Sequence, residues 1–223
     1  MPLAYICSLF KASDYLYTML MNFVALWSKY AMAVKGVLHV GAHMCEELDT
    51  YRALGITDIV WVEANSAIAA QAQAKYPGAT IVRETISDVD GKEVEFMITN
   101  NGQSSAILEF GTHSTEHPTV VEVSREIHHT KRLDTIYAEL GWAADRFDFL
   151  NIDIQGAELL ALRGMGDILA NFKYLYLEVN EKHLYQDCAL VGEIDQYLEQ
   201  FGFRRAETQM TGHGWGDAFY VKL

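Results

Sequence analysis

Cysteine is scarce in this sequence, with only Cys7, Cys45 and Cys188 among 223 residues. Three widely spaced cysteines, an odd number, argue against a disulfide framework, and their spacing to histidine matches no zinc site. We therefore expect a reducing, cytoplasmic setting and no structural zinc.

Positive charge is also in short supply. Lysine and arginine number 17 against 30 aspartates and glutamates, which gives a formal net charge of −13. Such a surface repels phosphate backbones, and the basic stretches at 131–133 and 203–205 are too short to bind nucleic acid. No nucleic-acid partner is therefore expected, and a neutral or cationic small molecule, a sugar or glycan, or a peptide fits better.

No apolar run in the sequence is long enough to span a bilayer comfortably. The most apolar stretch, 15–27, follows charged residues and lacks a clean signal-peptide cleavage site. Its apolar residues recur at helical spacing: Leu16, Leu20, Phe23, Val24 and Trp27. We predict an amphipathic helix in an N-terminal appendage, 1–35, that packs on the following domain or forms a homo-oligomer, without stable membrane insertion.

From residue 36 onward, short apolar runs alternate with helical patterns. Strands are predicted at 36–41, 58–64 and 79–87, and helices at 45–55 and 66–78. This alternation indicates right-handed crossovers and a parallel sheet covered on both faces. Half of the residues are hydrophobic, which is enough for one sizeable core, so 36–223 is predicted to be a single α/β domain.

The second half of the chain continues this pattern after an irregular section. That section is predicted as a hairpin-like pair, 92–100 and 102–110, and a long polar loop, 111–119, that holds His113 and His117. The later elements are predicted as a helix at 130–141, a strand at 147–155, a helix after Gly156, a strand at 174–180 and a helix at 190–202. Two closing strands, 203–210 and 217–223, suggest an antiparallel edge.

Ligands of open parallel sheets bind beyond the carboxyl ends of the strands. The residues at these predicted ends are 41–47, Glu63, Ser87, Asp88, Asp153, Glu178 and Asn180. Glu63 ends the second strand, where one carboxylate can accept hydrogen bonds from both ribose hydroxyls, and Gly41 lets the backbone approach a ligand closely. Together they indicate a nucleoside-bearing cofactor, although strand ends with glycine or glutamate are also common without one.

The glycine-rich motif of dinucleotide sites is absent from the loop after the first strand. This loop has one glycine followed by His43, Cys45, Glu46 and Glu47. Its acids would repel a pyrophosphate but not the ammonium and sulfonium groups of S-adenosyl-L-methionine. A nicotinamide-dependent oxidoreductase is therefore disfavoured, and S-adenosyl-L-methionine is favoured as the cofactor.

Six segments resemble the FkbM-type methyltransferases in order and roughly in spacing: VLHVGAH, VWVEAN, TISDVDG, GQSSAIL, RLDTI and FLNIDIQGAELLALRGM. The resemblance covers about residues 36–180, and the remaining strands fit the same sheet. It implies a class I methyltransferase-like (Rossmann-like) α/β fold, a three-layer sandwich with a mostly parallel seven-stranded sheet and an antiparallel last strand. It also implies methyl transfer from S-adenosyl-L-methionine, commonly to a hydroxyl of a sugar or natural product.

The resemblance also implies a set of cofactor-binding residues. They are Gly41, Ala42, His43, Glu46, Glu63, Ala64, Asn65, Ser87, Asp88 and Asp153. The sequence departs from the family pattern where His39 replaces an acid, His43 an asparagine, Cys45 a glycine, Asn151 a lysine and Gln155 a glutamate. These departures keep an alternative function open, a non-catalytic methyltransferase-like module that binds the cofactor or a glycan.

Asp153 ends a predicted central strand and, by resemblance, lies near the methyl group or the acceptor. We expect it to orient the acceptor, to act as a general base, or to ligate a divalent metal together with Glu158. The structural alternatives are that Asp153 satisfies N–H groups of the helix after Gly156, and that Glu158 stabilises the first turn of that helix through its dipole.

His213 lies between glycines and beside Trp215 in the loop that joins the last two strands. An imidazole and an indole in such a loop can hold the face of a sugar, and the imidazole can accept its proton. A turn with an incidental histidine is equally compatible with the sequence. Gln103, Ser104 and Ser105 are further candidates for acceptor contacts, and the sequence as a whole favours an O-methyltransferase.

Overall fold

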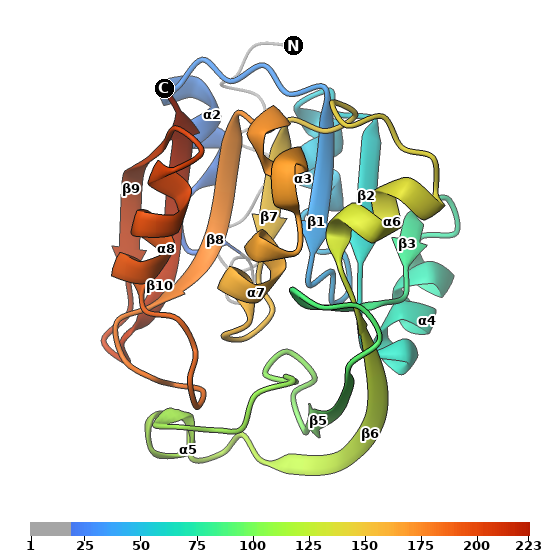
Figure 1. Ribbon diagram of the computed structural model, residues 1–223, viewed down its shortest axis with the longest axis vertical. Helices are drawn as coiled ribbons and strands as arrows, with labels where there is room; N and C mark the ends of the chain where they lie inside the picture. The colour runs from blue at the N-terminus through green and yellow to red at the C-terminus, as the bar shows by residue number, and fades with distance from the viewer. Residues whose placement is uncertain (1–18) are drawn as a thin grey trace.

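A seven-stranded sheet with helices on both faces forms the centre of the fold (Figure 1). The computed structural model of the protein describes residues 19–223. The strands of this sheet are β1 (Gly36–Val40), β2 (Asp58–Val62), β3 (Thr80–Val82), β7 (Phe149–Ile152), β8 (Tyr174–Asn180), β9 (Phe203–Met210) and β10 (Trp215–Lys222). Their order is β3-β2-β1-β7-β8-β10-β9, and β10 runs antiparallel to both of its neighbours. This is the predicted class I methyltransferase-like arrangement.

The last strand is antiparallel, as predicted, but it lies inside the sheet and not at an edge. β10 pairs with β8 on one side and with β9 on the other, so β9 forms the edge. The side chains of Ala218 and Tyr220 join the core on one face of the sheet, and Phe219 joins the core on the other. A strand with apolar side chains on both faces is stabilised by an interior position, which explains the insertion.

Each face of the sheet is covered by its own group of helices. One face carries α6 (Leu133–Glu139), α7 (Glu158–Arg163), α8 (Val191–Glu199) and a 3₁₀ helix (Gly166–Asn171), and the other carries α2 (Phe23–Lys29), α3 (Leu48–Ala53) and α4 (Ser66–Lys75). Every residue of β1 is buried, with Leu38 and Val40 in one core and Val37 in the other. The predicted three-layer sandwich is therefore confirmed.

Phe23, Val24 and Trp27 of the predicted N-terminal helix lie in α2, but Leu20 precedes that helix in a bend, so the helix begins later than predicted. Leu16 and the rest of the first 18 residues lie outside the described part of the chain. The ring of Phe23 packs against those of Tyr51 and Phe149, with centroid distances of 5.6 and 5.0 Å. The apolar side of α2 therefore covers the domain's own sheet. Among the described residues, no helix combines the length and the apolar character needed to cross a membrane.

A smaller sheet lies beyond the carboxyl ends of the central strands (Figure 1). Its strands are β4 (Thr85–Ile86), β5 (Glu93–Thr99) and β6 (Glu122–Lys131), in the order β4-β6-β5. The predicted hairpin of 92–100 with 102–110 is wrong, because β5 pairs along its whole length with β6 and only one bridge joins Met97 to Ala106. Segment 102–110 instead turns back toward the central sheet, where it contributes to the site described below.

Three other predicted boundaries shift for related reasons. The single strand expected at 79–87 is divided between β3 in the large sheet and β4 in the small one. The helix expected from residue 130 begins at Leu133, because the preceding residues end β6. The polar loop 111–119 contains one helical turn, α5 (His113–Glu116).

Candidate active site

A cavity of about 620 Å³ opens at the carboxyl ends of β1, β2, β7 and β8. This volume is within the usual range for a small-molecule or cofactor site. The turn after β1 and the end of β2 line one part of it, through Gly41, Ala42, His43, Glu46, Glu63 and Ala64. Segment 101–107 and residues 184–185 line another part, and Asp153 belongs to the same lining.

Gly41 brings the turn after β1 against the end of β7. Its φ is +92°, in the region that favours glycine. Its N–H and that of Ala42 both donate to the carbonyl of Val62, at 2.9 and 3.0 Å, which also joins this turn to the end of β2. The single glycine of the loop thus has a structural role that draws three strand ends together.

Glu63 and His43 are held by a network of backbone and side-chain hydrogen bonds. The Glu63 carboxylate accepts the N–H groups of His43 and Asn65 at 2.8 and 2.7 Å. Burial raises the pKa of Glu63, and these N–H groups partly oppose that shift. Burial lowers the pKa of His43, but the 2.6 Å bond between its Nδ1 and Glu46, together with nearby acids, raises it above the ordinary value overall. These contacts therefore favour the protonated, positively charged form of the imidazole in this part of the cavity.

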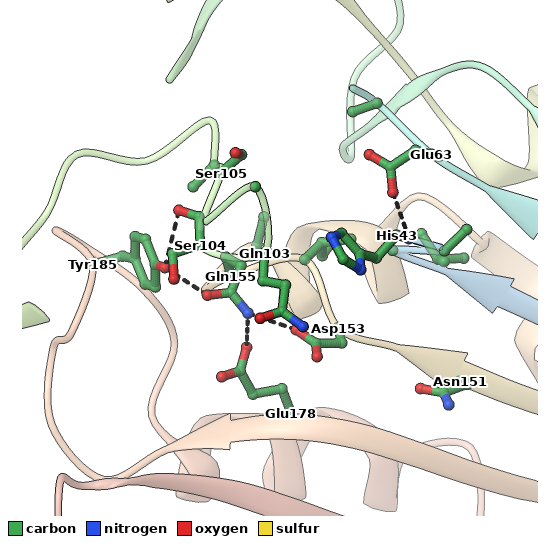
Figure 2. Close-up of a pocket in the computed structure, with 18 of the residues that line it drawn as sticks. His43, Glu63, Gln103, Ser104, Ser105, Asn151, Asp153, Gln155, Glu178 and Tyr185 are labelled. Atoms are coloured by element: carbon green, nitrogen blue, oxygen red, sulfur yellow. Dashed lines mark hydrogen bonds between the residues drawn. The ribbon is translucent and has the colours of Figure 1, made fainter. Parts of the chain in front are cut away.

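Gln155 joins two carboxylates and a tyrosine at the centre of the site (Figure 2). Its Nε2 donates to Asp153 Oδ1 at 2.7 Å and to Glu178 Oε2 at 2.9 Å, and its Oε1 accepts the Tyr185 hydroxyl at 2.6 Å. The φ of Gln155 is +58°, which is uncommon for a residue other than glycine, and this backbone conformation directs the side chain toward these partners. The amide therefore holds the end of β7, strand β8 and the segment after β8 in one arrangement.

The carboxyl groups of Asp153, Glu158 and Glu178 have raised pKa values, above all because of burial. The pKa of Glu158 is raised to about 7. Asp153 is enclosed by protein, yet its side chain remains accessible because it faces the cavity. A carboxyl group with a raised pKa in such a place is a candidate for proton transfer.

The proposed metal pair, Asp153 and Glu158, lies with Glu178 in a group whose ligand atoms are within 4.8 Å of one another. Other partners already occupy these oxygens. Glu158 Oε1 accepts the N–H groups of Ile154 and Gly156, at 3.0 and 3.1 Å, as expected for an acid that stabilises a helix start. The structural alternative stated for Glu158 is thus supported, and its metal role stays a prediction.

Several predicted acceptor residues lie on the opposite part of the cavity wall: Gln103, Ser104, Ser105 and Trp215. The backbone carbonyl of Ser104 accepts the Tyr185 hydroxyl at 3.3 Å. The Ser105 hydroxyl accepts the N–H of Thr99 at 3.1 Å. The serines therefore help to fix the wall.

Other predicted site residues do not line the cavity. They are Asn65, Ser87, Asp88, Glu158 and His213. The Asn65 side chain caps α4, and the Ser87 hydroxyl donates to Asp88 at 3.2 Å. His213 Nδ1 is 3.0 Å from Glu116, outside the cavity. Their roles in binding or catalysis stay predictions.

The structure also places residues in the cavity wall that the sequence did not single out as site residues. Tyr185 and Asp217 are two of these. Glu178 and Glu47, which the sequence placed at predicted strand ends without assigning them a role, also line the cavity. Tyr185 lies in an irregular segment, and its role depends on tertiary contacts for which the sequence has no signal.

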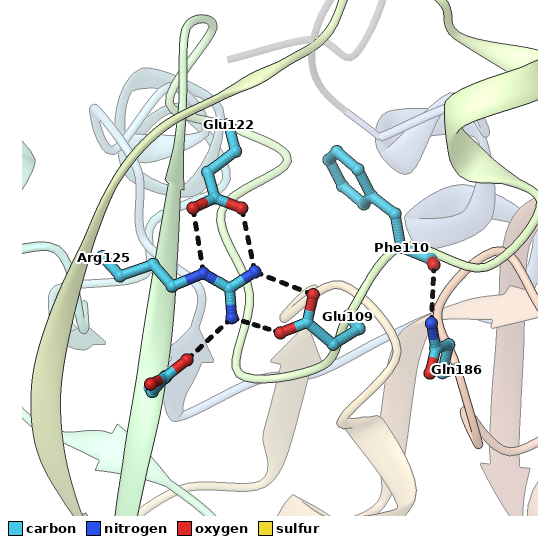
Figure 3. Close-up of polar contacts among 6 residues, drawn as sticks. Glu109, Phe110, Glu122, Arg125 and Gln186 are labelled. Carbon is cyan, nitrogen blue, oxygen red and sulfur yellow. Dashed lines mark hydrogen bonds and ion pairs between the residues drawn. The ribbon is translucent and has the colours of Figure 1, made fainter.

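Segment 102–110 is anchored at its far end by Arg125 of β6 (Figure 3). The guanidinium makes paired hydrogen bonds to Glu109 and to Glu122 and a further one to Glu95. The Gln186 side chain donates to the carbonyl of Phe110 at 3.2 Å. The wall that carries the two serines is therefore attached both to the small sheet and to the segment after β8.

The sequence matches a known family over most of its length. Residues 39–205 match the family described as Methyltransferase FkbM domain. The chain belongs to the FkbM methyltransferase family. The resemblance predicted from its motifs is confirmed, and the replacements at His43 and Gln155 in this FkbM-family protein both line the cavity.

Solved structures with a similar fold are distant in sequence. Magnesium protoporphyrin IX methyltransferase from Synechocystis PCC 6803, with bound S-adenosylmethionine, is 14% identical over 90% of this chain and 77% of its own, with a TM-score of 0.48. TrmK of M. capricolum, in complex with S-adenosyl-homocysteine, is 7% identical over 92% of this chain and 70% of its own, with a TM-score of 0.47. No curated protein matches the sequence.

Proposed function

We propose that this FkbM-family protein transfers a methyl group from S-adenosyl-L-methionine to a hydroxyl of a sugar, a glycan or another small acceptor. The observation that carries the proposal is the place of Asp153. It lies at the end of β7, beside the Glu63 and His43 part of the cavity and beside the wall that holds Ser104. One carboxylate therefore adjoins the region suited to a nucleoside and the region left for an acceptor.

In the donor region, Glu63 is assigned to the ribose. Each of its oxygens accepts one backbone N–H, which leaves a second lone pair on each for a ribose hydroxyl. His43 is assigned to the carboxylate of the methionine part, because the acids around it raise its pKa and so favour its protonated form. Bound S-adenosyl-L-methionine would supply an electrophilic methyl group on a sulfonium.

In the acceptor region, Asp153 is assigned to the proton of the hydroxyl. Transfer to oxygen requires the acceptor to be held in line with the methyl group, with a base in hydrogen-bond reach. Burial raises the pKa of Asp153 above its usual value, toward neutrality, where a carboxylate is a stronger base. Gln155 fixes the carboxylate through Oδ1, so that Oδ2 remains for the acceptor.

Calorimetric titration with S-adenosylhomocysteine tests the donor assignment, and a methyl-transfer screen over hydroxylated acceptors tests the reaction. Asp153→Asn is expected to lower transfer by about 100-fold, the usual size of a general-base contribution. Asp145→Asn, the same change at an exposed side chain that does not line the cavity, is the matched control. A folded protein that gives no heat with S-adenosylhomocysteine would refute the proposal, and binding without transfer to any acceptor would favour the non-catalytic module.

A further inference from the structure

We propose that the acceptor carries a protonated amine, which binds beside the Asp153 and Glu178 carboxylates and against an aromatic wall. This inference rests on the proposed methyl transfer, and it names the class of acceptor. The ammonium group anchors the molecule and is separate from the hydroxyl that receives the methyl group.

The charges on the cavity wall favour a cation. Among the described residues, the lining contains no lysine or arginine but seven acidic side chains: Glu46, Glu47, Glu63, Glu84, Asp153, Glu178 and Asp217. Lys182, close to this wall in sequence, pairs instead with Glu116 at 3.0 Å. A phosphorylated or carboxylated acceptor would find no lysine or arginine here, whereas an ammonium group would be attracted to the ionised acids and would favour ionisation of the others.

The acids divide between the two parts of the cavity. Glu46 and Glu63 are engaged with His43 in the donor region. Glu178 and Asp153 both accept from Gln155 Nε2, and Tyr185 donates to the other end of the same amide (Figure 2). Neither hydrogen bond of the donor region involves Glu178, so we assign its second oxygen to the acceptor.

Four aromatic rings continue the wall away from Gln155. The ring of Tyr185 lies 5.3 Å from that of His113, and His113 lies 5.0 Å from His117, measured between centroids. The His117 ring lies 6.5 Å from that of Trp215. Electron-rich faces of Tyr and Trp beside carboxylates are the usual surroundings of a bound organic ammonium group.

His113 adds an independent sign of a missing ligand. Its side chain lines the cavity and is 3% exposed, and its Nδ1 has no hydrogen-bond partner among the described residues. Burial lowers the pKa of His113 to about 4, so the ring is neutral and one nitrogen can accept a hydrogen bond. Buried polar atoms normally have partners, so this nitrogen is available to a hydrogen-bond donor of a bound molecule.

A metal ion is a poorer occupant of this region than an amine. The Gln155 amide N–H₂ donates to both Asp153 and Glu178, so it occupies the position that a shared cation would need. Glu158 is committed to two backbone N–H groups. An ammonium group requires only the Glu178 oxygen that Gln155 leaves free, Oε1, while Asp153 Oδ2 remains for the hydroxyl.

The test compares free amines with their N-acetyl derivatives, using D-glucosamine, D-galactosamine and tyramine as probes. Binding is measured by saturation-transfer NMR at pH 7 on protein saturated with S-adenosylhomocysteine. The free amine is expected to bind about tenfold more tightly than its N-acetyl partner, the size of one hydrogen bond to a charged group. Equal or weaker binding of the free amines in all three pairs would overturn the inference.

Two variants locate the preference. Glu178→Gln is expected to remove it, whereas Glu181→Gln, which removes an exposed charge just beyond the same strand, is expected to retain it. The assignment would be contradicted if Glu178→Gln still preferred the free amines. It would also be contradicted if a calorimetric titration showed that Mg²⁺ binds and abolishes the preference. If S-adenosylhomocysteine binds but the free amines are not preferred, this inference alone is refuted. If S-adenosylhomocysteine does not bind, the proposed function is refuted. The amine series can then still be measured on the free protein.

Discussion

A Cβ at position 41 would lie 1.8 Å from the carbonyl oxygen of Asp153, so the turn after β1 and the end of β7 are in direct backbone contact. Only glycine permits this approach, and the φ of +92° at Gly41 independently disfavours other residues. The turn that surrounds the donor region and the strand that carries the proposed base are therefore positioned by the same contact.

Gly41→Ala is expected to destabilise the fold by about 3 kcal/mol or more, because it adds a backbone clash to an unfavourable φ. Denaturant unfolding monitored by circular dichroism measures this loss. Gly78→Ala is the matched control, because a Cβ there meets no atom within 4 Å. Equal stability of the two variants would show that the contact between positions 41 and 153 can relax.

His43→Asn is expected to weaken binding of S-adenosylhomocysteine by about tenfold at pH 6 and to remove most of its pH dependence. The wild-type affinity should fall as the pH rises through the raised pKa of His43, because the imidazole loses the charge that faces the ligand carboxylate. Calorimetry between pH 6 and 8 would show this. 5′-Methylthioadenosine, which lacks the amino acid part, should bind with the same affinity at both ends of that range, and a parallel decline for both ligands would contradict the assignment.

Asp217 predicts a pH dependence of stability. Burial raises its pKa from 3.8 to about 7, so the folded protein retains a proton that the unfolded chain releases. The free energy of unfolding therefore falls as the pH rises from about 4 to about 7, by at most about 1.4 kcal/mol per pH unit for one group, and then levels off. Asp217→Asn lacks this contribution, so the difference in free energy of unfolding between the variant and the wild type should shift in favour of the variant as the pH rises. Urea unfolding at several pH values measures this difference, and a difference that stays constant across the range would contradict the prediction.

The sequence predicted the large sheet well because β1, β2, β7 and β8 are short apolar runs buried on both faces. Such strands form wherever crossover helices can cover them, so local pattern and tertiary structure agree. The small sheet was harder. β6 is polar and largely exposed along its length, and its partner lies more than twenty residues earlier in the chain, so neither hydrophobic periodicity nor a turn motif marked it.

The same distinction holds for the site. Glu63 and Asp153 follow apolar strands, so their positions at one sheet edge could be predicted. Tyr185 and His113 reach the cavity from irregular segments, and only the folded chain brings their rings within 5.3 Å. His213 resembled an acceptor contact because of its flanking glycines, but Glu116 holds its ring outside the cavity wall.

Gln155→Glu is expected to lower methyl transfer at pH 7 by about 10- to 100-fold, which is no more than the lower end of a full general-base contribution. The change removes the N–H donor shared by Asp153 and Glu178 and places a third carboxylate between them. In the family pattern a lysine precedes the aspartate by two residues, but this chain has Asn151 there, which donates to the Tyr51 hydroxyl and adds no compensating charge.

The pH profile separates this electrostatic effect from simple misfolding. An added negative charge raises the pKa of Asp153 further, so the acidic limb of kcat/KM against pH should move to higher pH, with activity partly recovered in alkaline buffer. Gln186→Glu, which introduces the same charge in the segment after β8 but outside the cavity wall, should leave the profile in place. If the acidic limb of the Gln155→Glu profile does not move, the group that titrates there is too far from the new carboxylate to be Asp153. The proton of the acceptor would then not pass to Asp153.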